Sequence, residues 1–373
     1  MSSAVPFPGC GAPRYDGAGA LAALDVEAVY VTPAARELIE RLQAAGALAP
    51  DASWRAAADL VGDPPGAALG RLARLVSTGA IRAKRRSWGG CPAMRIVDSQ
   101  IHVWGADTPD RPWPPGRAHL AQKPYPVTDA MVLEEMDAAG VDRAVLVPPS
   151  WEGDRNDLAL AAARRHPDRF AVMGRLAIER AESRALIPEW KQAPGMLGLR
   201  FTFHTDAQRP WLTDGTADWL WPAAEQAGLP VMIFVPGSLG VVGSIAARHP
   251  DLRLVLDHLA IGTSLRDHGA FADLPSLLAL AKHPNVAVKA SALPCYSTEP
   301  YPFRGLHPYI RQVFEAYGPR RTFWGTDLTR LPCTYRQAVT LFTEELPWLS
   351  ASDREWVMGR AVSEWLGWPL PRP

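Results

Sequence analysis

The stretch RIVDSQIHVW, residues 95–104, is typical of a buried strand that ends in polar side chains. Residues two apart in a strand point to the same face, so Gln100 and His102 project together. Similar apolar runs start at residues 142, 169, 198, 230, 252, 285 and 321. A helical stretch separates each run from the next. The chain therefore alternates strand and helix from residue 94 onward.

Eight such strands, each followed by a helix, predict a parallel (β/α)8, or TIM, barrel over residues 94–373. An open doubly wound sheet is the alternative. The absence of a Gly-rich loop after the first strand counts against it. The tail at 350–368 predicts a capped helix, which we expect to pack Trp356 and Trp365 against the outside of the barrel.

The composition excludes several classes of function. Lys plus Arg and Asp plus Glu number 39 each, so the formal net charge is zero and gives no long-range attraction to nucleic acid or anionic membranes. No stretch approaches the roughly 18 apolar residues of a membrane-spanning helix. The four cysteines are scattered without a CxxC pair, which is typical of reduced thiols: Cys10, Cys91, Cys295 and Cys333. We therefore expect a cytoplasmic enzyme that acts on a small molecule.

Residues 1–93 differ in character from the rest of the chain. Residues 1–31 carry no clear pattern, and residues 32–82 are Ala-rich with apolar residues at helical spacing. The first helix begins at TPAARE, with a Thr N-cap followed by proline. Three short helices followed by the basic tip RAKRRSWGG resemble a winged helix. We therefore expect an irregular segment at 1–31 and a small winged-helix-like domain at 32–93.

Several roles are open to this winged-helix-like domain. Residues 1–93 hold ten basic and eight acidic side chains, a net charge of only +2, and the basic ones cluster only at Arg82, Lys84, Arg85 and Arg86. DNA binding usually shows a larger positive footprint. We therefore favour a homodimer contact or a cover over the substrate, and nucleic-acid binding is disfavoured. Met94 stands directly before the first strand, so it is a possible alternative start of the catalytic part.

Barrel enzymes carry their chemistry where the strands end, which sorts the nine histidines. Three stand in His-Pro pairs between a helix and the next strand, at the opposite end, and are expected to be structural: His166, His249 and His283. Three close a strand at the active end: His102, His204 and His258. The remaining three lie in loops or at a helix start and are weaker candidates: His119, His268 and His307.

Further polar residues lie within or at the end of otherwise apolar strands: Asp98, Gln100, Arg200, Lys289, Ser291 and Asp327. Each one alone could be a core polar group with satisfied hydrogen bonds. Their convergence on one end of a barrel instead predicts an active site, because buried ionisable groups need partners. Three tryptophans near strand ends either line this site or pack loops: Trp104, Trp113 and Trp151.

Four motifs, each at a strand end, carry a family resemblance: VDSQIHVW, GLRF, LDHLA and WGTD. In this order they resemble the amidohydrolase superfamily, in the amidohydrolase-related branch that includes sugar lactonases and the lactonase of 2-pyrone-4,6-dicarboxylate. The resemblance covers residues 95 to about 368 and leaves the first 93 residues unexplained.

The resemblance implies a metal site that this sequence keeps only in part. Metal-dependent members have His-x-His in the first strand, one histidine each from the fifth and sixth strands, and an aspartate from the eighth. Here His102, His258 and Asp327 remain, Gln100 replaces the first histidine, and PVMIFVPGS in strand five offers none. Three ligands could still hold one divalent metal such as Zn. Other members are lactonases that work without a metal, and we expect that no cofactor is required.

In those metal-free lactonases the aspartate of the eighth strand acts as general base on water. The resemblance thus implies that Asp327 activates water while His102 and His258 stabilise the oxyanion. The residues expected to bind the substrate are Gln100, as an amide donor, Arg200, as a fork for a carboxylate, and His204, Lys289 and Ser291. The leading prediction is a hydrolase of a carboxylate-bearing lactone or a related cyclic ester or amide.

Two alternatives remain from the sequence. One is a metal-dependent decarboxylase on the same scaffold, which the two missing histidines disfavour. The other is a ligand-sensing regulator whose N-terminal segment binds DNA. Retention of Asp327 argues against it, because a binding pocket has little use for a carboxylate between two imidazoles.

Overall fold

The computed structural model describes residues 30–31, 81–82 and 94–370. In the N-terminal part, β1 (Tyr30–Val31) pairs antiparallel with β2 (Ile81–Arg82). Apart from β2, the winged-helix-like domain predicted at 32–93, and the dimer contact assigned to it, lie outside the described residues. From Met94 onward the chain forms a barrel, which carries every residue of the predicted active site.

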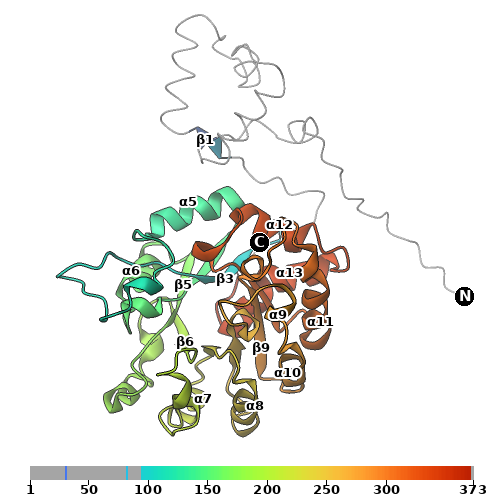
Figure 1. Cartoon of the computed structure of the whole chain (residues 1–373). Helices are drawn as coiled ribbons and strands as arrows, with labels where there is room; N and C mark the ends of the chain where they lie inside the picture. The colour runs from blue at the N-terminus through green and yellow to red at the C-terminus, as the bar shows by residue number, and fades with distance from the viewer. Residues whose placement is uncertain (1–29, 32–80, 83–93, 371–373) are drawn as a thin grey trace, which may run out of the picture. The chain divides into compact units, whose positions relative to one another are not determined.

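Eight parallel strands form the barrel wall (Figure 1). They pair in chain order, with the bounds β3 (Val97–Ile101), β4 (Arg143–Leu146), β5 (Phe170–Gly174), β6 (Met196–Thr202), β7 (Val231–Phe234), β8 (Leu254–Leu256), β9 (Val286–Ser291) and β10 (Thr322–Gly325). The first and last strands meet where the Asp327 N–H donates to the Gln100 carbonyl over 2.9 Å. The predicted (β/α)8 barrel is confirmed. Its strands all end on one side, which we call the mouth.

Helices connect the strands outside the wall. Their bounds are α5 (Asp129–Ala139), α6 (Asp157–Arg165), α7 (Leu220–Gln226), α8 (Leu239–Arg248), α9 (Asp267–Ala270), α10 (Leu274–Ala279), α11 (His307–Tyr317) and α12 (Tyr335–Thr343). The connection after β5 holds only short 3-10 helices, Ala181–Leu186 and Trp190–Gln192. His166 and His249 directly follow α6 and α8, at the end away from the mouth, as expected. Within the described ranges, no helix has the length and apolar character needed to cross a membrane.

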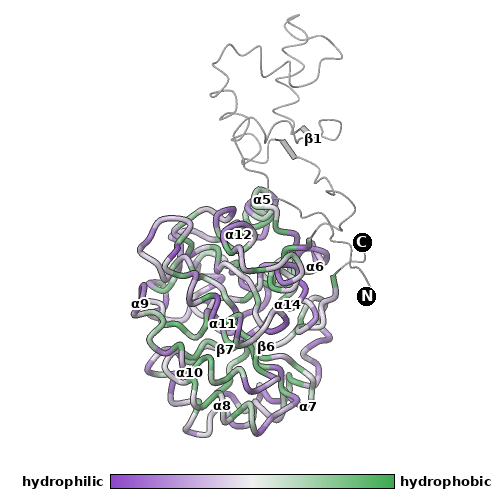
Figure 2. The backbone as a smooth tube through the Cα atoms, turned by 90° about the vertical axis from the view of Figure 1, so that its right-hand side faces the viewer, coloured by the Kyte–Doolittle hydropathy of each residue, from purple (hydrophilic) through white to green (hydrophobic). Residues whose placement is uncertain are grey.

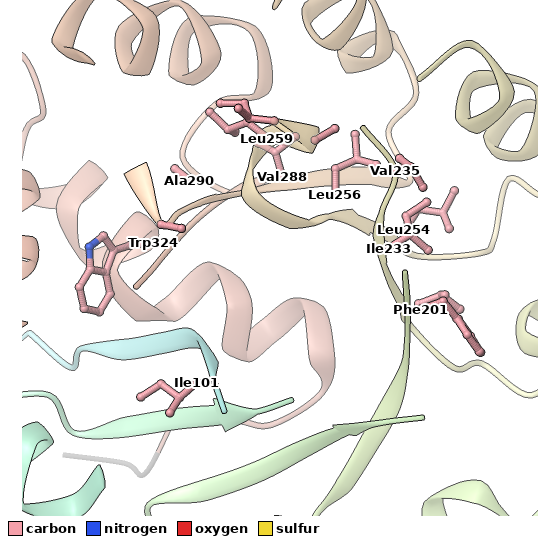
Figure 3. Close-up of a cluster of buried hydrophobic side chains, with 14 of the residues drawn as sticks. Ile101, Phe201, Ile233, Val235, Leu254, Leu256, Leu259, Val288, Ala290 and Trp324 are labelled. Carbon is pink, nitrogen blue, oxygen red and sulfur yellow. The ribbon is translucent and has the colours of Figure 1, made fainter. Parts of the chain in front are cut away.

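Apolar side chains pack in two layers. The outer layer lies between strands and helices, and Figure 3 shows part of it, including Phe201, Ile233, Leu254, Val288 and Trp324. The inner layer fills the barrel interior and includes Val97, Met173, Met232, Val255 and Phe323. Alternate residues of a strand face opposite sides, so these buried strands are apolar almost throughout. The tube in Figure 2 is accordingly coloured as hydrophobic around β6 and β7.

The C-terminal segment covers the barrel interior at the end opposite the mouth. It consists of α13 (Ala351–Glu355), a π-helical turn (Trp356–Arg360) and α14 (Ala361–Leu366). Trp356 and Leu366 belong to the same buried cluster as the inner residue Phe323, and the Trp365 ring lies 5.9 Å from the Phe323 ring. This placement corrects the expectation that the segment packs on the outer wall. The inner layer reaches the start of the strands, and its apolar side chains need a cover there.

Candidate active site

His102 follows β3 and enters the mouth. Its Nδ1 lies 2.5 Å from the Val147 carbonyl oxygen, and because a carbonyl only accepts, Nδ1 carries a hydrogen. Its Nε2 lies 3.2 Å from Asp327 Oδ1. A hydrogen bond between these two atoms requires a second ring hydrogen, whereas the Gln100 amide, 3.4 Å from the same Nε2, can donate only to an Nε2 without one. Only 4% of His102 is exposed, so the surroundings shield this pair from water.

Asp327 lies just beyond β10. Its φ of 53° is left-handed, which is uncommon outside glycine and costs about 1–3 kcal/mol. Its Oδ2 lies 3.1 Å from Arg330 Nη1 and 3.7 Å from His258 Nε2. Burial raises the pKa of Asp327, but the nearby histidines and Arg330 outweigh burial and hold that pKa well below its usual range. The group is therefore a carboxylate at any ordinary pH.

His258 follows β8 and also has a φ of 53°. Its Nδ1 lies 2.8 Å from Ser291 Oγ, and burial lowers the pKa of the ring to about 3, so the imidazole is neutral. When Ser291 donates to Nδ1, the ring hydrogen sits on Nε2 and faces the Asp327 carboxylate, which is the electrostatically favoured arrangement. His258 thus offers an N–H donor in the mouth. Two residues of one site thus adopt the unfavourable left-handed conformation. This indicates that the placement of their side chains matters more there than the local cost in stability.

A network of buried charges lies among these groups. Lys289 donates to Gln100 Oε1 over 2.6 Å, and its Nζ lies 2.9 Å from Asp257 Oδ1. Arg200 Nε donates to the other Asp257 oxygen over 3.0 Å. Burial raises the pKa of Asp257, but Lys289 and Arg200 outweigh it and lower that pKa to about 2. Gln100, Lys289 and Ser291 are 0% exposed, and each forms a hydrogen bond with a neighbouring side chain.

Asp98 lies in the barrel wall, contrary to the expectation that it faces the mouth. Its Oδ1 accepts the backbone N–H groups of Gln100 and Thr326, each over 2.9 Å. Its Oδ2 accepts hydroxyl groups from Thr326 and, over 2.8 Å, from Tyr335. Burial raises the pKa of Asp98 to about 6. The carboxyl group therefore ties β3 to the end of β10, which positions Gln100 and Asp327.

Aromatic rings and His204 surround the site. His204 follows β6 and is partly buried; its Nδ1 has no hydrogen-bond partner, and burial lowers its pKa to about 4. The Trp151 ring lies edge-on to His102 at 5.7 Å and to Trp104 at 5.2 Å. Trp113 is partly buried against the core. Trp104 therefore packs in the protein interior, whereas Trp151 directly contacts the imidazole of His102.

A hollow of about 420 Å³ opens beside Asp327. It is lined by Gln122, Lys123, Thr263, Arg266, Cys295, Ser297, Thr329, Arg330 and Pro332. Gln122 donates to Asp327 over 3.5 Å, and Arg330 is paired with the same carboxylate, so the hollow leads to it. Its lining carries three cations and no acid, which suits a polar or anionic small molecule.

Sequence reasoning missed four residues of this region. Asp257 stands in the LDHLA motif directly before His258, and Arg175 directly follows β5, so the search for polar residues at strand ends could have found both. Arg330 comes three residues after Asp327. Gln122 belongs to the long loop after β3, and no signal in the sequence pointed to it. The three weaker histidines lie away from the described contacts of Asp327: His119, His268 and His307.

The fold and the site define a (β/α)8-barrel enzyme with a carboxylate between two imidazoles. The sequence model of the amidohydrolase family matches residues 97–364, so the chain belongs to this family and is a hydrolase. It is 28% identical over 243 residues to L-fucono-1,5-lactonase from Burkholderia ambifaria, which covers 62% of this chain and 79% of that protein.

Solved structures agree on the fold. An amidohydrolase from Burkholderia multivorans, solved once with HEPES and once with Zn, has a TM-score of 0.61 in both forms at 22% and 21% identity. A probable 2-pyrone-4,6-dicarboxylic acid hydrolase from Acinetobacter baumannii, with citric acid bound, has a TM-score of 0.58 at 18% identity. Each likeness covers 74% of this chain and 100% of the other.

The family typically binds a metal, and the donors present here test whether this site would suit one. Within residues 94–370, no group of three or more His, Cys, Asp or Glu side chains is arranged to hold a metal ion. Arg330 takes up one oxygen of Asp327, and Lys289 takes up the oxygen of Gln100. Two positive groups at these oxygens oppose a divalent cation. The described residues therefore do not fit a metal.

Proposed function

We propose that this protein hydrolyses a lactone, or a related cyclic ester or amide, that carries a carboxylate, and that it needs no metal. The single observation that carries the proposal is the Asp327 carboxylate, held ionised between His102 and His258 beside a cationic hollow. The similarity to a lactonase over most of the barrel supports the choice of substrate class.

The residues suggest a sequence of proton transfers. Asp327 takes a proton from water as the oxygen attacks the carbonyl carbon. The Nε2–H of His258 stabilises the negative charge on the carbonyl oxygen, as does His102 when its Nε2 carries a hydrogen. The bond between the carbonyl carbon and the ring oxygen then breaks. Asp327 returns its proton to that oxygen, which leaves a hydroxy acid and the starting carboxylate.

The remaining assignments follow from the buried network. We propose that Arg200 binds a substrate carboxylate through its terminal nitrogens, since its Nε is taken up by Asp257. Gln100, Lys289 and Ser291 then act by holding His102, Asp257 and His258 in place. His204 completes the substrate side of the mouth.

A panel of lactones and cyclic amides, with and without a carboxylate, tests the activity. We expect carboxylate-bearing lactones to be opened to hydroxy acids. Each hydrolysis releases a proton, so the reaction can be measured as the release of acid. Activity should survive dialysis against a chelator, and metal analysis should show well under one equivalent of Zn or Mn. One tightly bound equivalent, with activity lost on chelation, would reject the metal-free mechanism. No turnover of any lactone or amide would reject the proposed function itself.

We also propose that residues 94–373 form the catalytic domain and that residues 32–93 provide a homodimer contact. The site residues all fall between 98 and 330, which supports the first part. Light scattering on the full chain and on a chain that starts at Met94 tests the second part. We expect a dimer and a monomer, respectively, with similar kcat. A cytoplasmic location is proposed as well, since Cys295 and Cys333 are free thiols.

A further inference from the structure

Arg175 is a buried cation at the mouth that the proposed mechanism does not use. It directly follows β5, and the pairing of Gly174 with Leu199 places it beside Arg200 on the neighbouring strand. Met173, two residues earlier, faces the barrel interior, so Arg175 faces the same way. Only 4% of Arg175 is exposed.

Within the described residues, the guanidinium of Arg175 is poorly satisfied: it has a long ion pair with one acid and no hydrogen bond at two of its nitrogens. Its Nε and Nη1 are buried without a hydrogen bond. The nearest acid is Asp154, whose Oδ1 lies 3.7 Å from Nε and whose side chain is 37% exposed. The buried Asp257 is already bound by Arg200 and Lys289. Three buried cations therefore share one buried carboxylate and the partly exposed Asp154, an excess of positive charge that a bound anion would balance.

His204 adds a second unsatisfied group on the same side. It lies four residues after Arg200 and two beyond the end of β6, and its Nδ1 is buried without a hydrogen bond. Burial, and after it the positive charges of Arg200 and Arg175, lower the pKa of His204 to about 4. Arg175 and His204, at adjacent strand ends, thus carry buried polar atoms without hydrogen bonds, which is typical of a recognition site whose ligand is needed to satisfy them.

We propose that Arg175, together with Arg200 and His204, forms an anion-binding subsite that holds a carboxylate of the substrate. A planar guanidinium fork matches a carboxylate with two parallel hydrogen bonds, and the low exposure strengthens them. The identity of the substrate at this subsite rests on the proposed function, and the subsite adds a reason for its specificity. Arg175 becomes the residue that selects substrates with a carboxylate over neutral ones.

A binding experiment tests the subsite without any turnover. Malonate is titrated by calorimetry at constant ionic strength, with chloride as the reference ion. We expect wild-type protein to bind malonate and Arg175→Met to bind it about 10- to 100-fold more weakly, which is the loss of a charge-assisted pair. Arg175→Lys keeps the charge without the fork and should fall between them. Arg164→Met, an exposed residue on α6, is the matched control and should bind as wild type.

Stability and kinetics separate a binding role from a structural one. Arg175→Met should fold and be at least as stable as wild type without anion, because it removes a buried charge that has only a long ion pair and no hydrogen bond at Nε and Nη1. Malonate should then raise the Tm of wild type and not that of the variant. With active lactones, kcat/KM should fall about 10- to 100-fold for a carboxylate-bearing substrate and stay near wild type for its neutral amide.

The outcomes keep this subsite distinct from the proposed function. Absence of malonate binding to wild type, or equal binding by wild type and Arg175→Met, overturns the subsite whatever the enzyme hydrolyses. An equal loss of kcat/KM on charged and neutral substrates also overturns it. If no lactone is hydrolysed, malonate binding that depends on Arg175 still supports the anion subsite, while the proposed reaction fails.

Discussion

Asp327 is the residue on which the proposed chemistry depends, and its neighbours keep it ionised. Replacing it with asparagine removes the proton acceptor and leaves the size of the side chain unchanged. We expect Asp327→Asn to lower kcat about 10²- to 10⁴-fold, the usual contribution of a general base, with a much smaller change in KM. Steady-state kinetics on the best substrate of the panel measure both constants.

The matched control for Asp327→Asn is the same change at Asp251, an exposed residue in the turn before β8. Asp251→Asn should leave kcat unchanged. If Asp327→Asn keeps more than half of the wild-type kcat, another group activates the water, and the assignment of the general base is wrong.

Lys289 provides a second test at the scale of one side chain, because it is fully buried between Gln100 and Asp257. Lys289→Met leaves Asp257 with Arg200 alone and leaves the Gln100 oxygen without its donor. Breaking a buried ion pair from one side typically costs about 3–5 kcal/mol. We expect a loss of that size in the free energy of unfolding, measured by urea denaturation, whereas Lys282→Met on the surface should change it little.

At the scale of elements, the closure of the barrel depends on a glycine. A Cβ on Gly325 in β10 would lie 2.4 Å from Ser99 Oγ and 3.1 Å from Asp98 Oδ1 in β3. Gly325→Ala therefore pushes the first and last strands apart. We expect it to lower the free energy of unfolding by about 1–3 kcal/mol, as overpacking of a core does, and to lower kcat because Asp327 follows β10 directly.

A double mutant shows whether this close contact is the cause. Ser99 Oγ is buried without a hydrogen bond, so Ser99→Ala alone should leave stability unchanged or slightly higher. In the double mutant Ser99→Ala/Gly325→Ala the nearest clash is gone, and part of the lost stability should return. Strictly additive effects of the two changes would show that the strands do not press against each other at this point.

Individual strands and helices also show how much of the fold could be predicted from the sequence. Continuous apolar runs such as PVMIF and HP pairs such as that of His166 predicted the strands and their direction, because burial on both faces and helix ends are local properties. Asp98 could not be placed from sequence, since its partners Thr326 and Tyr335 lie far along the chain. Likewise, the C-terminal cover and the partners of Lys289 follow from tertiary packing alone.

At the scale of the whole molecule, buried titratable groups set the response to acid. Burial lowers the pKa of His258 to about 3 and that of His204 to about 4, from an ordinary value of 6.5. Between pH 6.5 and 4 the unfolded chain therefore binds protons that the folded chain does not, so folding loses stability as the pH falls. Asp98 acts in the opposite sense, since its folded pKa of about 6 exceeds the ordinary 3.8.

The balance of these groups gives a testable profile of stability against pH. Each fully buried group changes the free energy of unfolding by at most about 1.4 kcal/mol per pH unit. His204 contributes less, because water partly screens it. Of these three groups, only the two histidines act above pH 6, so stability should begin to fall near pH 6.5. Below pH 6 the protonation of Asp98 in the folded state offsets one of them, and the fall should become shallower.

Urea denaturation at fixed ionic strength, at half-unit steps from pH 7 to 4.5, measures this profile. In Asp98→Asn the side chain at position 98 no longer titrates. The stability of this variant should therefore keep falling steeply below pH 6, where the wild-type curve flattens. The two curves should run nearly parallel between pH 7 and 6.5, because the histidines titrate alike in both proteins and Asp98 is still mostly ionised there. Asp98→Asn removes the Asp98 titration, so a stability of this variant that rises as the pH falls from 6.5 to 6 would mean that a histidine is protonated in the folded protein. If that histidine is His258, both of its ring nitrogens carry a hydrogen, and its assignment as a neutral donor in the mouth is wrong.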